Sequence, residues 1–258
     1  MFERFRNEHI TNEDRADQGI ARGDIAEAEA YLDAIIRKNV HWNTLHHAFL
    51  KKSALSLHEI VRGDAEKDPR IYDEANAIYG ELGEMLSNEL HDRHAIDGQR
   101  IGRVSELIAF MLPLRAPIDE TTPLFMVPAP RKDDKAGIDF YVIGRNMTKL
   151  KNGWPIQIKT SATQEDVVRY TNSRTTLISM DSLDPFAGDP DHEASLAQRM
   201  LRELDGKATP EDIAVLNSAS AALYEKILQE NQGMHRRSQA LFYAALQLIQ
   251  HEEMPVAA

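Results

Sequence analysis

Apolar residues recur at helical spacing over most of the first 98 positions of this chain. Within 17–39 they are Ile20, Ala28, Tyr31, Leu32, Ile35 and Ile36. Within 68–90 they are Ile71, Ala75, Ile78, Leu82, Met85 and Leu86. Spacings of three and four place such residues on one face of an α-helix. The second set forms a heptad-like seam that needs a partner helix, and the Asp68-Pro69 pair before it is typical of a helix start.

Between 99 and 182 the pattern alternates between short helices and strands. The run at 99–114 predicts a helix stopped by Pro113, and 164–170 predicts a second short helix. Apolar, β-branched and aromatic residues predict strands at 122–130, 138–144, 154–161 and 174–180. We expect a turn at 131–137 and a polar loop at 145–152. The predicted order is α-β-β-β-α-β.

Helical spacing returns after a linker at 181–193 that is rich in Pro, Gly and Asp. One apolar stripe consists of Leu216, Leu223, Ile227 and Leu228. A second stripe consists of Leu241, Phe242, Leu246 and Ile249. The chain is therefore predicted to be α+β, with a helical region at 1–98, a mixed core at 99–182, and a linker with helices at 183–258. Because one sheet cannot cover all these stripes, we expect the helices at 71–98 and 209–251 to form a bundle that supports a homodimer.

Composition narrows the class of protein. The chain has 258 residues, no cysteine, 28% charged residues and a net charge of −11. The absence of cysteine excludes disulfides, cysteine-ligated zinc and a thiol nucleophile. No apolar run reaches the length of a membrane span, and the first residues lack the apolar region of a signal peptide. We expect a cytoplasmic protein with no membrane segment.

The distribution of charge changes what the net value suggests about partners. Residues 99–182 contain 12 Lys and Arg against 9 Asp and Glu, whereas the flanks contain 18 against 32. The core segment is thus mildly basic inside an acidic chain. Its charge is compatible with a nucleic-acid partner, although the net charge of the chain alone argues against one.

The polar residues of the core segment carry the candidate chemistry. Asp139 belongs to one predicted strand, and Gln157 and Lys159 lie two residues apart on the next, so these two share a face. Together with Glu106 in the preceding helix, they resemble the motif of the PD-(D/E)xK nuclease superfamily. That motif has an acid on the first helix, an aspartate on the second strand and an acid-x-Lys triplet on the third. Gln157 replaces the usual acid, as in the Mrr-type restriction endonucleases.

The resemblance, which covers about 80 residues, implies a restriction-endonuclease-like αβββαβ core with helical segments on both sides. It implies Mg²⁺- or Mn²⁺-dependent hydrolysis of phosphodiester bonds in DNA, with RNA as another possible substrate. Asp139, Gln157, the carbonyl of Ile158 and Glu106 would hold the metal, and Lys159 would orient the attacking water or stabilise the transition state. Arg145, Lys149 and Lys151 would contact backbone phosphates.

Two other functions stay open at this point. An amide in place of a carboxylate weakens a Mg²⁺ site, so the same fold could serve as a catalytically inactive nucleic-acid-binding or assembly module. The chain could also be a helical scaffold with a small inserted sheet. Convergence of Glu106, Asp139, Gln157 and Lys159 would favour the enzyme.

The remaining polar motifs have simpler interpretations. His41, His46 and His47, and the His91/His94 pair, are predicted to lie on polar helix surfaces. The acids in 131–134 are predicted to belong to a turn. Trp42 and Trp154 are predicted to anchor the core or a loop.

Overall fold

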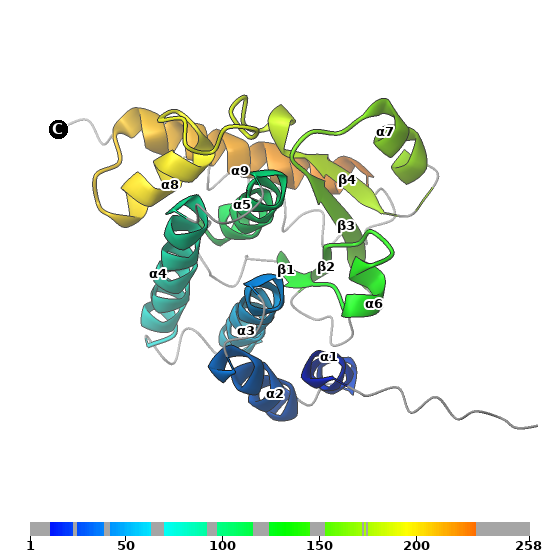
Figure 1. The fold of residues 1–258 in the computed structure, drawn as a ribbon. Coiled ribbons are helices and arrows are strands. Elements are labelled where there is room, and N and C mark those ends of the chain that lie inside the picture. Colours follow the sequence, from blue (N-terminus) through cyan, green and yellow to red (C-terminus); the bar gives the residue numbers. More distant parts are fainter. Residues whose placement is uncertain are drawn as a thin grey trace, which may run out of the picture.

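The computed structural model describes residues 11–22, 25–38, 42–62, 70–91, 97–115, 124–144, 153–171, 173 and 175–230. Within them the protein is α+β, with helices around a small four-stranded mixed sheet (Figure 1). The predicted fold class is therefore confirmed at this level.

In the described part of the chain, four helices precede α5, as the helical spacing predicted. They are α1 (Asn12–Arg22), α2 (Ile25–Arg37), α3 (Trp42–Arg62) and α4 (Arg70–His91). A capping box starts α1, because the Thr11 hydroxyl accepts from the Asp14 amide while the Asp14 carboxylate accepts from the Thr11 amide. Helices α1 to α3 share a small apolar cluster formed by Ala16, Ile20, Ala28, Leu32, Ile35, Ala48 and Leu55.

The middle of the chain follows the predicted order of elements. After α5 (Asp97–Met111) and the 3₁₀ turn η1 (Leu112–Arg115) come β1 (Leu124–Pro128), α6 (Arg131–Asp134), β2 (Phe140–Gly144), β3 (Trp154–Lys159), α7 (Gln164–Thr171) and β4 (Thr176–Ser179). The predicted turn after β1 contains α6, a single helical turn. Strand β2 is shorter than predicted, and Asp139 lies directly before it.

The strands lie in the order β1-β2-β3-β4. β1 pairs antiparallel with β2, and β2 pairs antiparallel with β3. β4 pairs parallel with β3, with Gln157 opposite Leu177 and Lys159 opposite Ser179. Parallel neighbours need a crossover connection, and α7 lies within the segment that joins β3 to β4.

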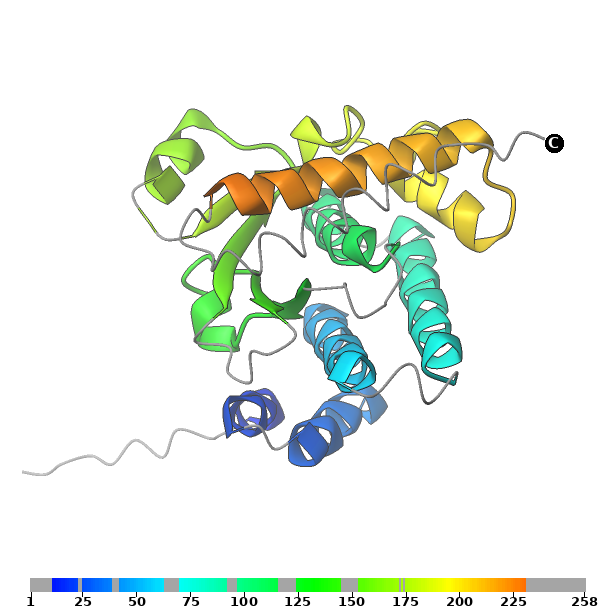
Figure 2. The ribbon, with the colours of Figure 1, turned by 180° about the vertical axis from the view of Figure 1, so that it is seen from behind.

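The main core joins the sheet to helices from both ends of the chain. Its buried residues come from α3, α4, α5, all four strands, α8 (Leu196–Leu204) and α9 (Pro210–Glu230). Figure 2 shows α9 running across the molecule, and α9 contacts β4, α8 and η1. The predicted stripe on α9 is confirmed for Leu216, Leu223 and Ile227, which are buried.

The heptad-like seam finds its partners inside the chain. Leu82, Met85 and Leu86 are buried in the main core, where α4 contacts α3, α5 and α8. This packing gives no support for a homodimer through α4. The second C-terminal stripe, at 241–249, lies outside the described residues. Among the helices that are described, none is long and apolar enough to cross a membrane.

Two valines that differ in burial can be used to test whether α5 packs in the core. Val104 on α5 is 1% exposed, whereas Val168 on α7 is 56% exposed. We expect Val104→Ala to lower the free energy of unfolding by about 2 kcal/mol, because it removes buried apolar volume. The matched change Val168→Ala should alter it by less than about 0.5 kcal/mol. Equal effects of the two changes in urea unfolding would contradict the placement of α5 in the core.

Candidate active site

Asp139 lies where β3 continues beyond its last residue paired with β2. The pairing of these strands ends at Phe140 and Ile156, so the backbone of Ile158 lies past the last pair. The Asp139 Oδ2 atom accepts hydrogen bonds from the Ile158 amide and from Gln157 Nε2, both at 2.6 Å. The Asp139 amide donates to the carbonyl of Ile156 at 2.8 Å. Asp139 is thus fixed against β3 by both its backbone and its side chain.

Gln157 is buried and lies between Asp139 and α7. Its Nε2 atom also donates to the Ile158 carbonyl at 3.1 Å, and the Tyr170 hydroxyl lies 3.4 Å from its Oε1 atom. Gly137 closes this corner with a φ of +88°. A Cβ there would stand 2.7 Å from the Tyr170 hydroxyl oxygen and 3.3 Å from Gln157 Oε1. Both the backbone conformation and the available space therefore require glycine.

Glu106 approaches the same place from α5. Its side chain is 21% exposed, and its Oε2 atom lies 3.4 Å from His46 Nε2. Burial, and then the negative charge of Glu106, raise the pKa of Asp139 to about 7, although the hydrogen bond from the Ile158 amide acts in the opposite direction. Neighbouring carboxylates disfavour each other's ionisation. The structure therefore joins Asp139 to Gln157 by a hydrogen bond, and Glu106 acts on Asp139 through its charge.

Lys159 lies two residues beyond Gln157 on β3, so its side chain leaves the same face of the sheet. It is partly buried, and its charge lowers the pKa of Asp166, although hydrogen bonds from Thr163 have the larger effect on that carboxyl. No contact between Lys159 and Asp139 is found among the described residues. Its predicted role thus has support from its place on the strand, and not from a direct contact.

The structure corrects the interpretation of one histidine. His46 was predicted to lie on a polar helix surface, but it is 1% exposed and packs inside the molecule. Its Nδ1 atom lies 3.5 Å from Glu89 Oε1, and Glu89 in turn accepts from Arg103 Nε at 2.8 and 2.9 Å. His91 is exposed as predicted, while His41 and His94 lie outside the described residues.

Sequence spacing held a signal for this buried charge cluster. His46, Leu50 and Ala54 recur at intervals of four on α3, and the latter two are buried core residues. Glu89 lies three residues after the buried Leu86 on α4. A charged residue on the apolar stripe of each helix indicates a buried ion pair, because an unpaired buried charge is too costly.

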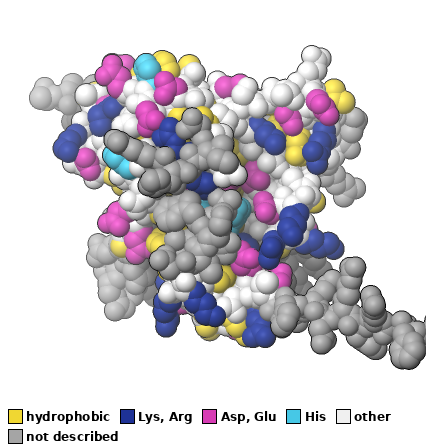
Figure 3. Space-filling model, in the orientation of Figure 1, with side chains coloured by type: hydrophobic (Ala, Val, Ile, Leu, Met, Phe, Trp, Pro, Cys, Tyr) yellow, Lys and Arg dark blue, Asp and Glu magenta, His cyan; other side chains and the backbone are white. Residues whose placement is uncertain are grey.

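Three basic residues of this part of the chain are exposed. They are Lys132 on α6, Lys135 directly after α6, and Arg169 on α7. Figure 3 shows acidic, basic and histidine side chains close together in the middle of one face. The predicted phosphate contacts Arg145, Lys149 and Lys151 lie outside the described residues.

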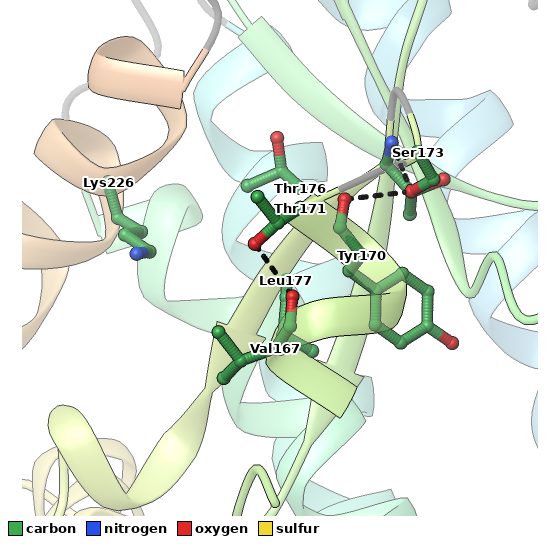
Figure 4. A pocket seen from close by; sticks show the side chains of 8 residues that line it. Val167, Tyr170, Thr171, Ser173, Thr176, Leu177 and Lys226 are labelled. Atoms are coloured by element: carbon green, nitrogen blue, oxygen red, sulfur yellow. Dashed lines mark hydrogen bonds between the residues drawn. The ribbon is translucent and has the colours of Figure 1, made fainter. Parts of the chain in front are cut away.

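A pocket of about 410 Å³ lies on the other side of Tyr170. It runs along the outer edge of β4, between α7 and α9, with Val167 and Thr171 on one side and Lys226 facing them (Figure 4). The Tyr170 ring turns away from Lys226 in this view, and its hydroxyl meets Gln157. The pocket is separate from the carboxylates, and Tyr170 links the two.

The oxygen atoms at the site suit a hard cation such as Mg²⁺ or Mn²⁺, which prefers carboxylate and carbonyl ligands. Asp139, Glu106 and the Ile158 carbonyl supply such atoms, and a cation would stabilise the ionised form of Asp139, which burial and the charge of Glu106 disfavour. The set contains only two carboxylates. In the described ranges no group of three His, Asp or Glu has the spacing of metal ligands.

Comparison of the chain with protein-family models, with curated proteins and with solved structures gives no match. The case for a function therefore depends on the geometry of the site.

The carboxyl of Asp139 should titrate near pH 7, well above the usual value of about 3.9. Carbon-13 NMR of the side-chain carboxyl measures this directly. In Glu106→Gln the repulsive charge is lost, so the pKa of Asp139 should fall while burial keeps it above the usual value. A midpoint near pH 4 in the unsubstituted protein would contradict the described environment.

The raised pKa of Asp139 also makes the free energy of unfolding depend on pH. The folded state holds the Asp139 proton more tightly than the unfolded chain, so the free energy of unfolding should fall as pH rises from about 4 to 7. Asp139→Asn should remove this contribution to the pH dependence, which urea unfolding at several pH values would show.

Proposed function

We propose that the protein is a metal-dependent nuclease that hydrolyses phosphodiester bonds of DNA. The observation that carries the proposal is the cluster formed by Asp139, Gln157, the Ile158 backbone and Glu106. Two carboxylates and a backbone carbonyl offer the oxygen ligands that a hard cation prefers. A perturbed carboxyl pKa at such a place is typical of a functional site.

The order of elements supports the same proposal. Helix α5, strands β1 to β3, helix α7 and strand β4 follow the α-β-β-β-α-β order of the PD-(D/E)xK core. In that scheme Glu106 takes the helix position, Asp139 the position on the second strand, and Gln157 and Lys159 the triplet on the third. We include a restriction-endonuclease-like core in the proposal on this basis.

Each side chain then has a distinct task. Asp139 must lose its proton to act as the main anionic ligand, which a pKa of about 7 allows near neutral pH. Gln157 would need to turn its amide so that the carbonyl, and not Nε2, faces Asp139. Glu106 would take part directly or through water. When bound, Mg²⁺ supplies hydroxide at neutral pH and neutralises the charge that develops on the phosphate.

Lys159 is assigned to the transition state. An ammonium group is no metal ligand, but on the face of Gln157 it can hold the attacking water or stabilise the pentavalent phosphate. The exposed Lys132, Lys135 and Arg169 offer positive charge for backbone phosphates. DNA as substrate, a cytoplasmic location and a homodimer belong to this proposal as further expectations, and RNA is the other substrate to test.

A catalytically inactive binding module is the second candidate. The observation in its favour is the direction of the Gln157 amide, which donates to Asp139 and so satisfies the carboxylate without a cation. A site that fills its own hydrogen bonds has less need of metal. In that case the nuclease-like core would bind nucleic acid or protein and cut nothing.

Three variants separate these functions. Asp139→Ala should abolish Mn²⁺ binding and plasmid nicking while the fold persists. Lys159→Ala should keep metal binding but lower turnover by about 100-fold or more, because transition-state stabilisation is lost. Gln157→Glu adds a carboxylate and should tighten metal binding. Calorimetry and nicking assays with DNA and RNA substrates measure all three.

Glu165→Ala is the matched control, since Glu165 is an exposed acid on α7. It should bind Mn²⁺ and nick DNA as the unsubstituted protein does. If the unsubstituted protein and Gln157→Glu both fail to bind metal and to cut, the nuclease proposal is wrong and the binding module stands.

A further inference from the structure

The imidazole of His46 bridges two acids from two different helices. His46 lies on α3, and its Nε2 atom is 3.4 Å from Glu106 Oε2 on α5. On the other side its Nδ1 atom is 3.5 Å from Glu89 Oε1 on α4. Its side chain has no exposed surface. Three helices therefore meet through one ring.

Neither ring nitrogen of His46 has a hydrogen-bond partner within the described part of the chain. The two carboxylates are the polar groups that face them. Distances of 3.4 and 3.5 Å are longer than a well-formed hydrogen bond, so the contacts are best described as ion pairs. The ring thus lies between two carboxylates, with one of them facing each of its nitrogen atoms.

The two acids differ in how firmly they are held. Glu89 has no exposed side-chain surface and receives two hydrogen bonds from Arg103 Nε. Glu106 is 21% exposed and forms an ion pair with His46. Glu89 and Arg103 thus form an anchor inside the helices, while Glu106 stands at the border with the site. His46 connects the anchor to that border.

We propose that His46 is a positioning residue, which holds the Glu106 carboxylate beside Asp139. Helices α3 and α4, which precede the nuclease-like core in the sequence, thereby form part of the site. This role rests on the proposed nuclease function. His46 touches neither the substrate nor a metal in this scheme, and acts through Glu106.

Metal binding tests the role, and it does not depend on turnover. His46→Gln and His46→Leu should weaken Mn²⁺ binding by about 10- to 100-fold, which is typical for residues that orient a ligand. Calorimetry should be run above pH 7, so that Asp139 is ionised. Glu106→Gln is the reference variant and should weaken binding by at least as much. His46→Gln retains a donor, so it should lose less than His46→Leu.

Loss of stability needs its own control. Arg115→Gln breaks the partly buried Arg115–Glu203 ion pair, whose shortest distance is 2.6 Å, between η1 and α8. It should lower the melting temperature but leave Mn²⁺ affinity within about twofold. If His46→Leu does not fold, His46→Gln alone carries the comparison. Wild-type Mn²⁺ affinity in a folded His46→Gln, together with weak binding by Glu106→Gln, would overturn the proposal.

NMR of the imidazole separates this inference from the nuclease proposal. In the metal-free protein, Glu106→Gln should shift the His46 Nε2–H signal more than the Nδ1–H signal, and Glu89→Gln should do the reverse. If the protein neither binds Mn²⁺ nor nicks DNA, the nuclease proposal fails, and these shifts alone decide the contact. Unchanged His46 signals in Glu106→Gln would overturn the positioning role.

Discussion

The backbone amide of Ile158 is buried at a point where β3 continues beyond its pairing with β2. It therefore needs another hydrogen-bond acceptor. A buried N–H without one costs about 1–3 kcal/mol. Asp139 meets this need with the same oxygen that accepts from Gln157 Nε2. The position of the carboxylate fixes its neighbours: Gln157 turns towards it, Tyr170 covers the far side of the amide, and Gly137 leaves the space that both occupy. The end of a strand pairing thus becomes a polar corner with a defined shape.

That corner lies next to further buried charge. Burial, and after it the negative charge of Glu106, raise the pKa of Asp139. On the opposite side of Glu106 the charge is balanced, because His46 stands between Glu106 and the Glu89–Arg103 pair. On the His46 side of the site, positive side chains face the carboxylates. On the Asp139 side, no such positive side chain is found among the described residues. A divalent cation among the oxygen atoms of the site would supply positive charge there.

Sequence patterns predicted the elements better than their contacts. Runs of apolar, β-branched and aromatic residues predicted β1 to β4, and the two-residue period put Gln157 and Lys159 on one face. Asp139 and Gln157 were expected to belong to one site, and in the structure a hydrogen bond joins them. The spacing of apolar residues gives no pairing of helices, so His46 was assigned to a surface, although it shares the apolar stripe of Leu50 and Ala54. The direction of the Gln157 amide could not be predicted either. It depends on contacts with Asp139, the Ile158 carbonyl and Tyr170, and residue spacing does not reveal these contacts.

We propose that Asp139, Glu106 and the Ile158 carbonyl form one cation site. The most direct measurement is an anomalous difference map from a crystal soaked in Mn²⁺ at a pH above 7. We expect one strong peak within coordination distance of Asp139 and the Ile158 carbonyl, with the Gln157 amide turned away from its bond to Asp139. A map with no peak there, and with Gln157 Nε2 still bonded to Asp139, would contradict it.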